Sequence, residues 1–147
     1  SISGAGDIKS TSIFETEETF KAKISGSGGI SINIDAPKVE LETSGSGDID
    51  IYTNTSHVKG KISGTGDFKI NGTTTSSNYN ISGSGDIEAY ALNCELSDIN
   101  VSGSGDIEVF VSDDLDVNIS GSGNVYFKGY PSISSNISGS GKIYDRN

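Results

Sequence analysis

The chain has 147 residues, with 20 glycines, 2 prolines and 1 cysteine, and only 32% of its residues are hydrophobic. A globular domain usually has about 45–50% apolar residues, so this composition predicts a single domain, residues 1–147, with a narrow or repetitive core. Ten basic residues against twenty acidic ones give a net charge of −10, which excludes binding to the phosphate backbone of nucleic acid. No apolar run approaches the roughly 18 residues of a membrane helix, so we expect no membrane insertion.

A six-residue motif, most often Ser-Gly-Ser-Gly-Asp-Ile, occurs eight times between Ser3 and Ile143. The first glycines of successive copies are separated by 22, 19, 19, 19, 20, 18 and 18 residues. These glycines are Gly4, Gly26, Gly45, Gly64, Gly83, Gly103, Gly121 and Gly139. The chain therefore consists of repeats with a period near 19 residues.

The segments on either side of each motif alternate between apolar and polar residues, which is the period of a strand. In chain order, the clearest expected strands are residues 20–24, 30–34, 39–43, 49–51, 68–70, 107–111 and 115–119. No segment has the apolar period and the end signals of a helix. Each repeat is therefore predicted to be a strand, a glycine corner and a second strand.

A repeat of this length is too short for a four-stranded propeller blade, so equivalent strands should stack in parallel on successive turns of a coil. We predict an all-β fold, a single-stranded right-handed parallel β-helix of about seven turns. Glycines are expected at the corners because they accept positive φ and let neighbouring turns approach closely. The predicted inward side chains are Ile24, Ile30, Ile49, Ile62, Phe68, Ile81, Ile87, Val101, Ile107, Ile119, Val125, Ile137 and Ile143.

These eight repeats, with Ile or Val two residues before the first glycine, resemble the head GIN domain family of auto-transporter adhesins over nearly the whole chain. The resemblance implies a right-handed β-helix in a bacterial protein that is secreted or anchored at the outer membrane surface, without an established enzymatic activity or defined site residues. The strand-rich segment that usually precedes such repeats is missing, and the chain begins at Ser1. We therefore expect it to be part of a larger chain, or its bare ends to stack on other copies or on a partner.

Four aspartates follow the second glycine of consecutive motifs and should be neighbours in a column: Asp48, Asp67, Asp86 and Asp106. Carboxylates about 5 Å apart repel by about 3 kcal/mol per pair at an effective dielectric of 20, so something must offset this repulsion. Calcium is one explanation, but the β-rolls that bind it repeat their ligands at nonapeptide spacing. We favour hydrogen bonds from corner N–H groups and Ser hydroxyls to each carboxylate, and we predict no metal and no cofactor.

A second polar column lies three residues before the first glycine and consists of Asn80, Asn100, Asn118 and Asn136. Stacked amides hydrogen-bond to one another in cross-β ladders, and we expect the same here. The repeat accounts for these residues, so no separate function is assigned to them.

Outward positions five and seven after the first glycine form the candidate ligand face. They carry Tyr52, Tyr90 and Phe110, with Glu88 and Glu108 beside them, and Tyr126 and Tyr144 near the C-terminal end. Aromatic rows with carboxylates can hold sugars. Cross-strand packing on a flat sheet explains the same residues equally well, so both interpretations stay open.

The sequence predicts no catalytic site. Cys94 and His57 lie in different repeats, and we expect a buried apolar cysteine and a surface histidine rather than a catalytic pair. The only arginine is Arg146, and no insert between repeats pairs an acid with a base. We predict a non-enzymatic, cell-surface or secreted adhesin-like module whose partner is a glycan or a host-surface protein. The alternatives are a carbohydrate-binding module and a structural spacer.

Overall fold

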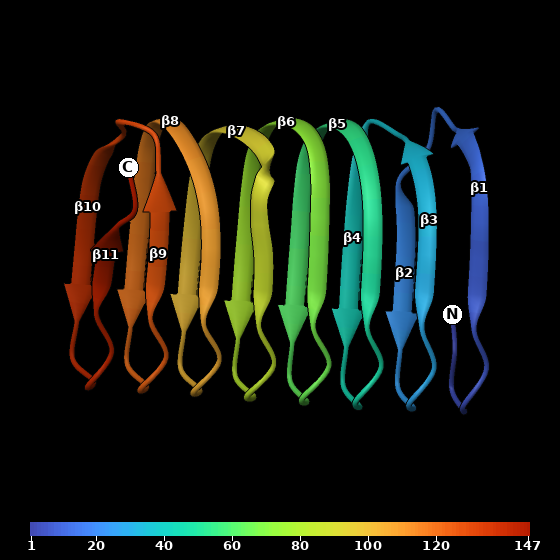
Figure 1. Ribbon diagram of the computed structural model, residues 1–147, viewed down its shortest axis with the longest axis horizontal. Coiled ribbons are helices and arrows are strands. Elements are labelled where there is room, and N and C mark those ends of the chain that lie inside the picture. Colours follow the sequence, from blue (N-terminus) through green and yellow to red (C-terminus); the bar gives the residue numbers. More distant parts are fainter.

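The structure, a computed structural model, describes all 147 residues and contains strands and corners without any helix, and hence no membrane-spanning helix. Eleven strands form one sheet that is wound into a coil (Figure 1). The strands are β1 (Ile8–Glu15), β2 (Phe20–Ile24), β3 (Ile30–Asp35), β4 (Lys38–Thr43), β5 (Ile49–Ile62), β6 (Phe68–Ile81), β7 (Ile87–Val101), β8 (Ile107–Ile119), β9 (Val125–Lys128), β10 (Ser132–Ile137) and β11 (Ile143–Asp145). All pairs of neighbouring strands are parallel, as predicted.

Each turn of the coil has two flat sides. The near face comprises β1, β3, β9, β11 and the first parts of β5 to β8, whereas β2, β4, β10 and the second parts of β5 to β8 form the far face. β5 shows the division, because its residues 49–54 pair with β3 and its residues 57–62 pair with β4. In Figure 1 the near strands run upward and the far strands downward while the chain advances from right to left, which makes the coil right-handed.

The register of the strands follows the motif. Ile30 pairs with Ile49, which pairs with Phe68, an offset of 19 residues each time. The same column continues through Ile87, Ile107, Val125 and Ile143. These pairings confirm the predicted solenoid of about seven turns with a period of about 19 residues.

The glycine corners stack directly on one another. The Ser84 amide donates a hydrogen bond to the Gly64 carbonyl oxygen at 3.0 Å, and a Cβ placed on Gly83 would overlap that oxygen. Close approach between turns is therefore why glycine is needed at the corner. The expectation of positive φ there was wrong, because positive φ occurs only at Gly72 and Gly129, both outside the motif.

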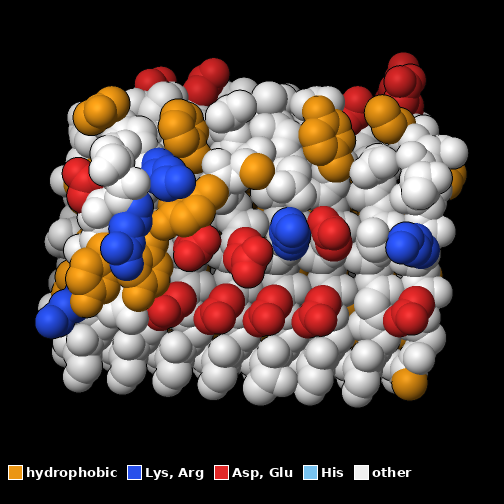
Figure 2. Space-filling view, viewed as in Figure 1, with side chains coloured by type: hydrophobic (Ala, Val, Ile, Leu, Met, Phe, Trp, Pro, Cys, Tyr) orange, Lys and Arg blue, Asp and Glu red, His pale blue; other side chains and the backbone are white.

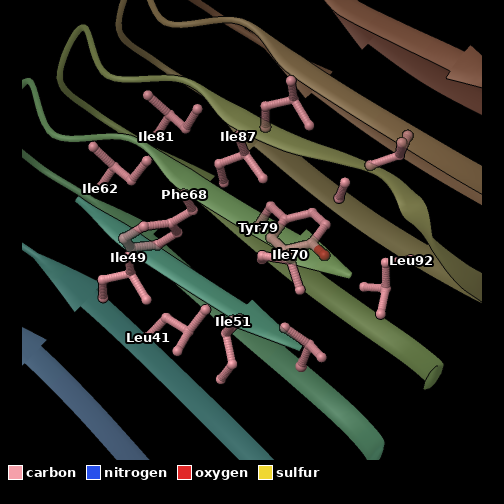
Figure 3. Packing of buried hydrophobic residues seen from close by; sticks show 14 of the residues in the cluster. Leu41, Ile49, Ile51, Ile62, Phe68, Ile70, Tyr79, Ile81, Ile87 and Leu92 are labelled. Atoms are coloured by element: carbon pink, nitrogen blue, oxygen red, sulfur yellow. The ribbon is translucent and has the colours of Figure 1, made fainter. Parts of the chain in front are cut away.

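The core is one hydrophobic cluster of 30 buried residues between the two faces, dominated by isoleucine (Figure 3). Tyr79 is the largest fully buried side chain, and its ring lies against Gly60, its register partner in the preceding turn. A Cβ on Gly60 would be 2.9 Å from Cδ1 of Tyr79. The two residues therefore form a small–large pair that keeps the spacing between turns constant.

Two of the predicted inward residues are not buried. Ile137 in β10 is 42% exposed, and Ile143 in β11 is only half-buried. Both pair with buried residues, Ile119 and Val125, but they belong to the last turn that the structure describes and are covered on one side only. Ile8 and Phe14 of β1 pair with the buried Ile30 and Ile34, and they are exposed at the opposite end for the same reason.

A glycine-to-alanine comparison tests the close stacking of the corners. Gly83→Ala forces Cβ into a backbone carbonyl and should lower the free energy of unfolding by at least about 2 kcal/mol. Gly4→Ala is the control, because no atom lies within 4 Å of its new Cβ, and it should change stability by less than about 1 kcal/mol. Denaturant unfolding of both variants gives the two values. Equal destabilisation would contradict the packing argument.

Candidate functional site

The aspartate column caps the corners of successive turns. The backbone N–H groups of Asp67, Asp86, Asp106 and Asn124 each donate to Oδ1 of the carboxylate in the turn before. The distances are 2.9 Å from Asp67 to Asp48, 2.8 Å from Asp86 to Asp67, 2.6 Å from Asp106 to Asp86 and 2.6 Å from Asn124 to Asp106. The Ser hydroxyls do not bond to these carboxylates, so the expected capping is confirmed for the backbone donors only.

These hydrogen bonds supply the compensation that the stacked charges require. Each one joins an N–H donor to an ionised acceptor, which makes it stronger than a bond between neutral groups. No group of three or more His, Cys, Asp or Glu side chains in the structure is arranged to hold a metal ion. Calcium independence remains a prediction.

The asparagine column stacks in register but does not form the expected amide ladder. Asn100 pairs with Asn80 on one side and Asn118 on the other, yet its Nδ2 donates to Oδ1 of Asp98 at 3.0 Å. A carboxylate two residues away is a stronger acceptor than a neighbouring amide oxygen, so the ladder prediction was wrong. The column lines a shallow groove on the far face together with Ser102, Ser120 and Ser138.

All seven residues of the candidate ligand face lie on the near face, but they do not form one row. Glu88 and Glu108 are register partners. Phe110 pairs with Asn93 rather than Tyr90, because the register of β7 shifts between Ala89 and Asn93. Tyr52 is 44% exposed and pairs with Asn33 and Asn71, away from the other aromatic rings.

The C-terminal turns gather a cluster that we call the aromatic patch: Tyr90, Phe110, Tyr126, Lys128, Tyr144 and Arg146. The rings of Tyr126 and Tyr144 stack with centroids 5.1 Å apart and an interplanar angle of 11°. Cζ of Arg146 lies 4.9 Å from the Tyr126 centroid, and Nζ of Lys128 lies 4.5 Å from the Tyr90 centroid. Figure 2 shows this patch at the C-terminal end of the near face, on the left, beside the acidic row that follows the corners.

Lys128 and Arg146 were not predicted as site residues. Both lie seven residues after the first glycine of their motif, the same position as Tyr90 and Phe110. Equivalent positions of successive repeats stack on one another, so this shared position could have identified Lys128 and Arg146 as site residues from the sequence. A cation held against an aromatic ring gains about 0.5–1 kcal/mol at an exposed site.

Acidic groups border the patch and change its titration. Burial raises the pKa of Tyr126, and the Asp106 carboxylate raises it further. Burial also raises the pKa of Tyr90, with Glu108 adding to the effect. Tyr126 and Arg146 line a shallow hollow with Asp86, Glu88, Asp106 and Glu108. The patch thus offers aromatic faces, carboxylate acceptors and cationic donors within one surface.

His57 and Cys94 do not meet. Cys94 is buried, and its Sγ contacts Ser77 Oγ at 3.4 Å and the Leu96 carbonyl oxygen at 3.0 Å. Burial raises the pKa of the Cys94 thiol, which disfavours the thiolate. His57 is half-buried on the far face, with Nδ1 2.8 Å from Ser76 Oγ. The expectation that these two residues form no catalytic pair agrees with this placement.

Two substitutions at one position test the corner capping. Asp86→Ala removes the acceptor of the Asp106 amide and should cost about 1–3 kcal/mol of stability. Asp86→Asn keeps an acceptor and relieves repulsion, so it should leave stability unchanged or raise it; Asn124 already accepts the Lys142 amide in this way. Asp50→Ala on the same face is the control.

A calcium titration is a second test of the corner capping. If millimolar calcium raised the melting temperature of the unmodified chain by more than several degrees, the capping account would fail.

The chain is similar to known proteins in sequence and in fold. Residues 1–131 match the family described as "putative auto-transporter adhesin, head GIN domain". A "putative adhesin" from Parabacteroides distasonis has the same fold, with a TM-score of 0.87 and 24% identity over 98% of this chain and 64% of that chain. A "putative adhesin" from Bacteroides fragilis has a TM-score of 0.79 and 27% identity over 86% of this chain and 60% of that chain.

A third solved structure, a "putative lipid binding protein" from Parabacteroides distasonis, has a TM-score of 0.81 and 28% identity over 98% of this chain and 61% of that chain. The chain thus spans less than two thirds of the length of each of these three proteins. No curated protein matches its sequence. Because the family match covers most of the chain, the chain belongs to the head GIN domain family of auto-transporter adhesins.

Proposed function

We propose that the chain is a non-enzymatic, adhesin-like module of a cell-surface or secreted protein, and that it binds its target through the aromatic patch. Membership of an adhesin family and the names of two similar structures support this role. The observation that carries the proposal is the clustering of four aromatic rings and two cations on the last turns of the near face.

The patch is suited to binding because its side chains are already held in place. The Tyr126 and Tyr144 rings stack on each other, and Arg146 lies against both, 5.6 Å from the Tyr144 centroid. The strands beneath them are fixed by backbone hydrogen bonds to neighbouring turns. Little conformational entropy is then lost when a ligand binds, which favours affinity.

A glycan is the target that the neighbouring carboxylates favour, and a carbohydrate-binding module is therefore the second candidate function. The C–H face of a sugar ring can pack on an exposed tyrosine, while its hydroxyl groups donate to carboxylates. Tyr144 is 38% exposed, and Glu88 and Glu108 border the same hollow as Tyr126 and Arg146. Few, well-placed polar groups beside an apolar surface are typical of small-molecule sites.

Binding to a glycan array and to host-matrix proteins tests the proposal. Tyr144→Ala removes an exposed ring that takes no part in the core, so it should weaken binding of any glycan or protein ligand by about 30-fold, as expected for an interface hot spot. Tyr90→Ala should weaken it as well. Tyr52→Ala is the matched control, since this exposed tyrosine lies on the same face outside the patch.

The outcomes separate the candidate functions. Binding to glycans that is lost with Tyr144→Ala and kept with Tyr52→Ala supports the carbohydrate-binding module. Binding only to matrix proteins with the same mutational pattern supports an adhesin with a protein target. A chain that binds nothing in either assay, or that binds equally well after Tyr144→Ala, would contradict a role for the patch and favour a structural spacer.

A further inference from the structure

The far face has an uneven distribution of charge along the solenoid axis. The strands β2, β4 and β5 present outward Lys21, Lys23, Lys38, Lys59 and Lys61 with Glu40 and Glu42, so five lysines minus two glutamates give +3. The strands β7 and β8 present Asp98, Asp114 and Asp116, which give −3. The far side of β6 lies between them and carries neutral Ser76, Asn78 and Asn80.

The lysine region is only partly neutralised by its own glutamates. Glu40 is 2.9 Å from Nζ of Lys21 and 2.8 Å from Nζ of Lys38, and these contacts lower its pKa to about 2. Glu42 is 3.3 Å from Nζ of Lys23. Lys59 forms no ion pair.

The aspartate region, in contrast, contains no ion pair. Asp98 accepts hydrogen bonds only from the amides of Asn78 and Asn100. Neither Asp114 nor Asp116 forms a salt bridge. Two regions of opposite net charge therefore lie on one flat face, separated by a neutral strand.

We propose that a second copy of this chain binds the far face, related to the first by a two-fold axis that runs along β6 in the plane of the interface. This rotation reverses the order of the turns and keeps each residue at its height along the strands. β5 then faces β7 of the second copy, and β4 faces β8. A self-complementary contact of this kind is the ordinary geometry of a homodimer.

The strand register sets which residues meet. Lys59, Asn78 and Asp98 occupy one column on β5, β6 and β7, so Lys59 faces Asp98 of the second copy. A second column runs from Lys38 through Ser76 to Asp114, so Lys38 faces Asp114 of the second copy. Both contacts occur twice by symmetry. Sheets that pack face to face are about 10 Å apart, a distance that a lysine and an aspartate can bridge.

The same column explains an exposed leucine. Leu96 is 41% exposed on the far face and occupies the position that faces His57 of the second copy. Burial and the nearby Lys38 and Lys59 lower the pKa of His57, so this ring is neutral at pH 7 and can cover an apolar side chain. The one like-charge contact is between Glu40 and Asp116, where Lys21 and Lys38 already neutralise Glu40.

The alternative face-to-face arrangement, with the axis along the solenoid, is disfavoured by charge. It would place lysines on lysines and aspartates on aspartates.

The size of the face also suits a dimer. Seven strands spaced about 4.8 Å apart, each with six residues that rise about 3.3 Å per residue, cover about 700 Å² per copy. A standard protein interface buries about 800 Å² per partner. Because the surface is polar, association should weaken as salt screens the charges.

Sedimentation equilibrium at low and high ionic strength tests this proposal, which is independent of the proposed function. We expect a dimer at low salt that dissociates as salt rises. Lys59→Asp and Asp98→Lys should each raise the dissociation constant by at least about tenfold, because each creates two like-charge contacts. An equimolar mixture of the two variants should associate again, since every altered contact then joins opposite charges. That recovery also shows that both variants are folded.

Variants on the near face serve as controls. Lys69→Asp and Asp50→Lys change the net charge by the same amounts but lie on the opposite face, so they should leave association unchanged. A chain that stays monomeric at low salt and millimolar concentration would overturn the proposal. A dimer that ignores Lys59→Asp and Asp98→Lys but dissociates with Ile137→Lys would overturn it too, and would indicate end-to-end stacking instead.

Discussion

Hydrogen bonding between the backbones of successive glycine corners is the interaction on which this structure depends. The amides of Ser46, Ser84 and Ser104 each donate to a glycine carbonyl of the preceding turn at 3.0 Å. This geometry leaves no space for a side chain at the corner glycines. Once the corners stack in this way, the strands on both faces must pair in parallel and in register, and the isoleucines of successive turns must meet in the core.

Stacking in register multiplies every outward residue into a column, and the columns determine the chemistry of the surface. A column of like charges is costly, and the structure offsets this cost by using each carboxylate as the acceptor for the next corner amide. The same stacking brings Tyr126, Tyr144 and Arg146 together on the near face. On the far face it separates lysines from aspartates. Ligand binding and self-association would therefore use opposite sides of one rigid solenoid.

The fold could be predicted from the sequence because one motif fixes both the corner and the inward residues. The ligand face was harder to predict, because outward positions far from the corner no longer pair with their equivalents when successive repeats differ in length. The spacing of 20 residues from Gly83 to Gly103 is followed by one of 18 to Gly121, and β7 absorbs the difference by shifting its register. Phe110 consequently pairs with Asn93 rather than Tyr90. Ile137 fits the inward pattern of its repeat, and its exposure was not predicted because the repeat pattern alone does not distinguish a terminal turn from a central one.

Amide hydrogen exchange at the corners is the measurement that tests the central claim most directly. The Ser84 and Ser104 amides are held by the preceding turn, whereas the Ala5 amide, at the equivalent position of the first turn, has no such acceptor. Stacked corners should therefore protect Ser84 and Ser104 to the same degree as amides of the central strands, and Ala5 should exchange rapidly. Protection of Ser84 as low as that of Ala5, with the strand amides still protected, would contradict the account, because the corners would then be loose loops on an otherwise ordered sheet.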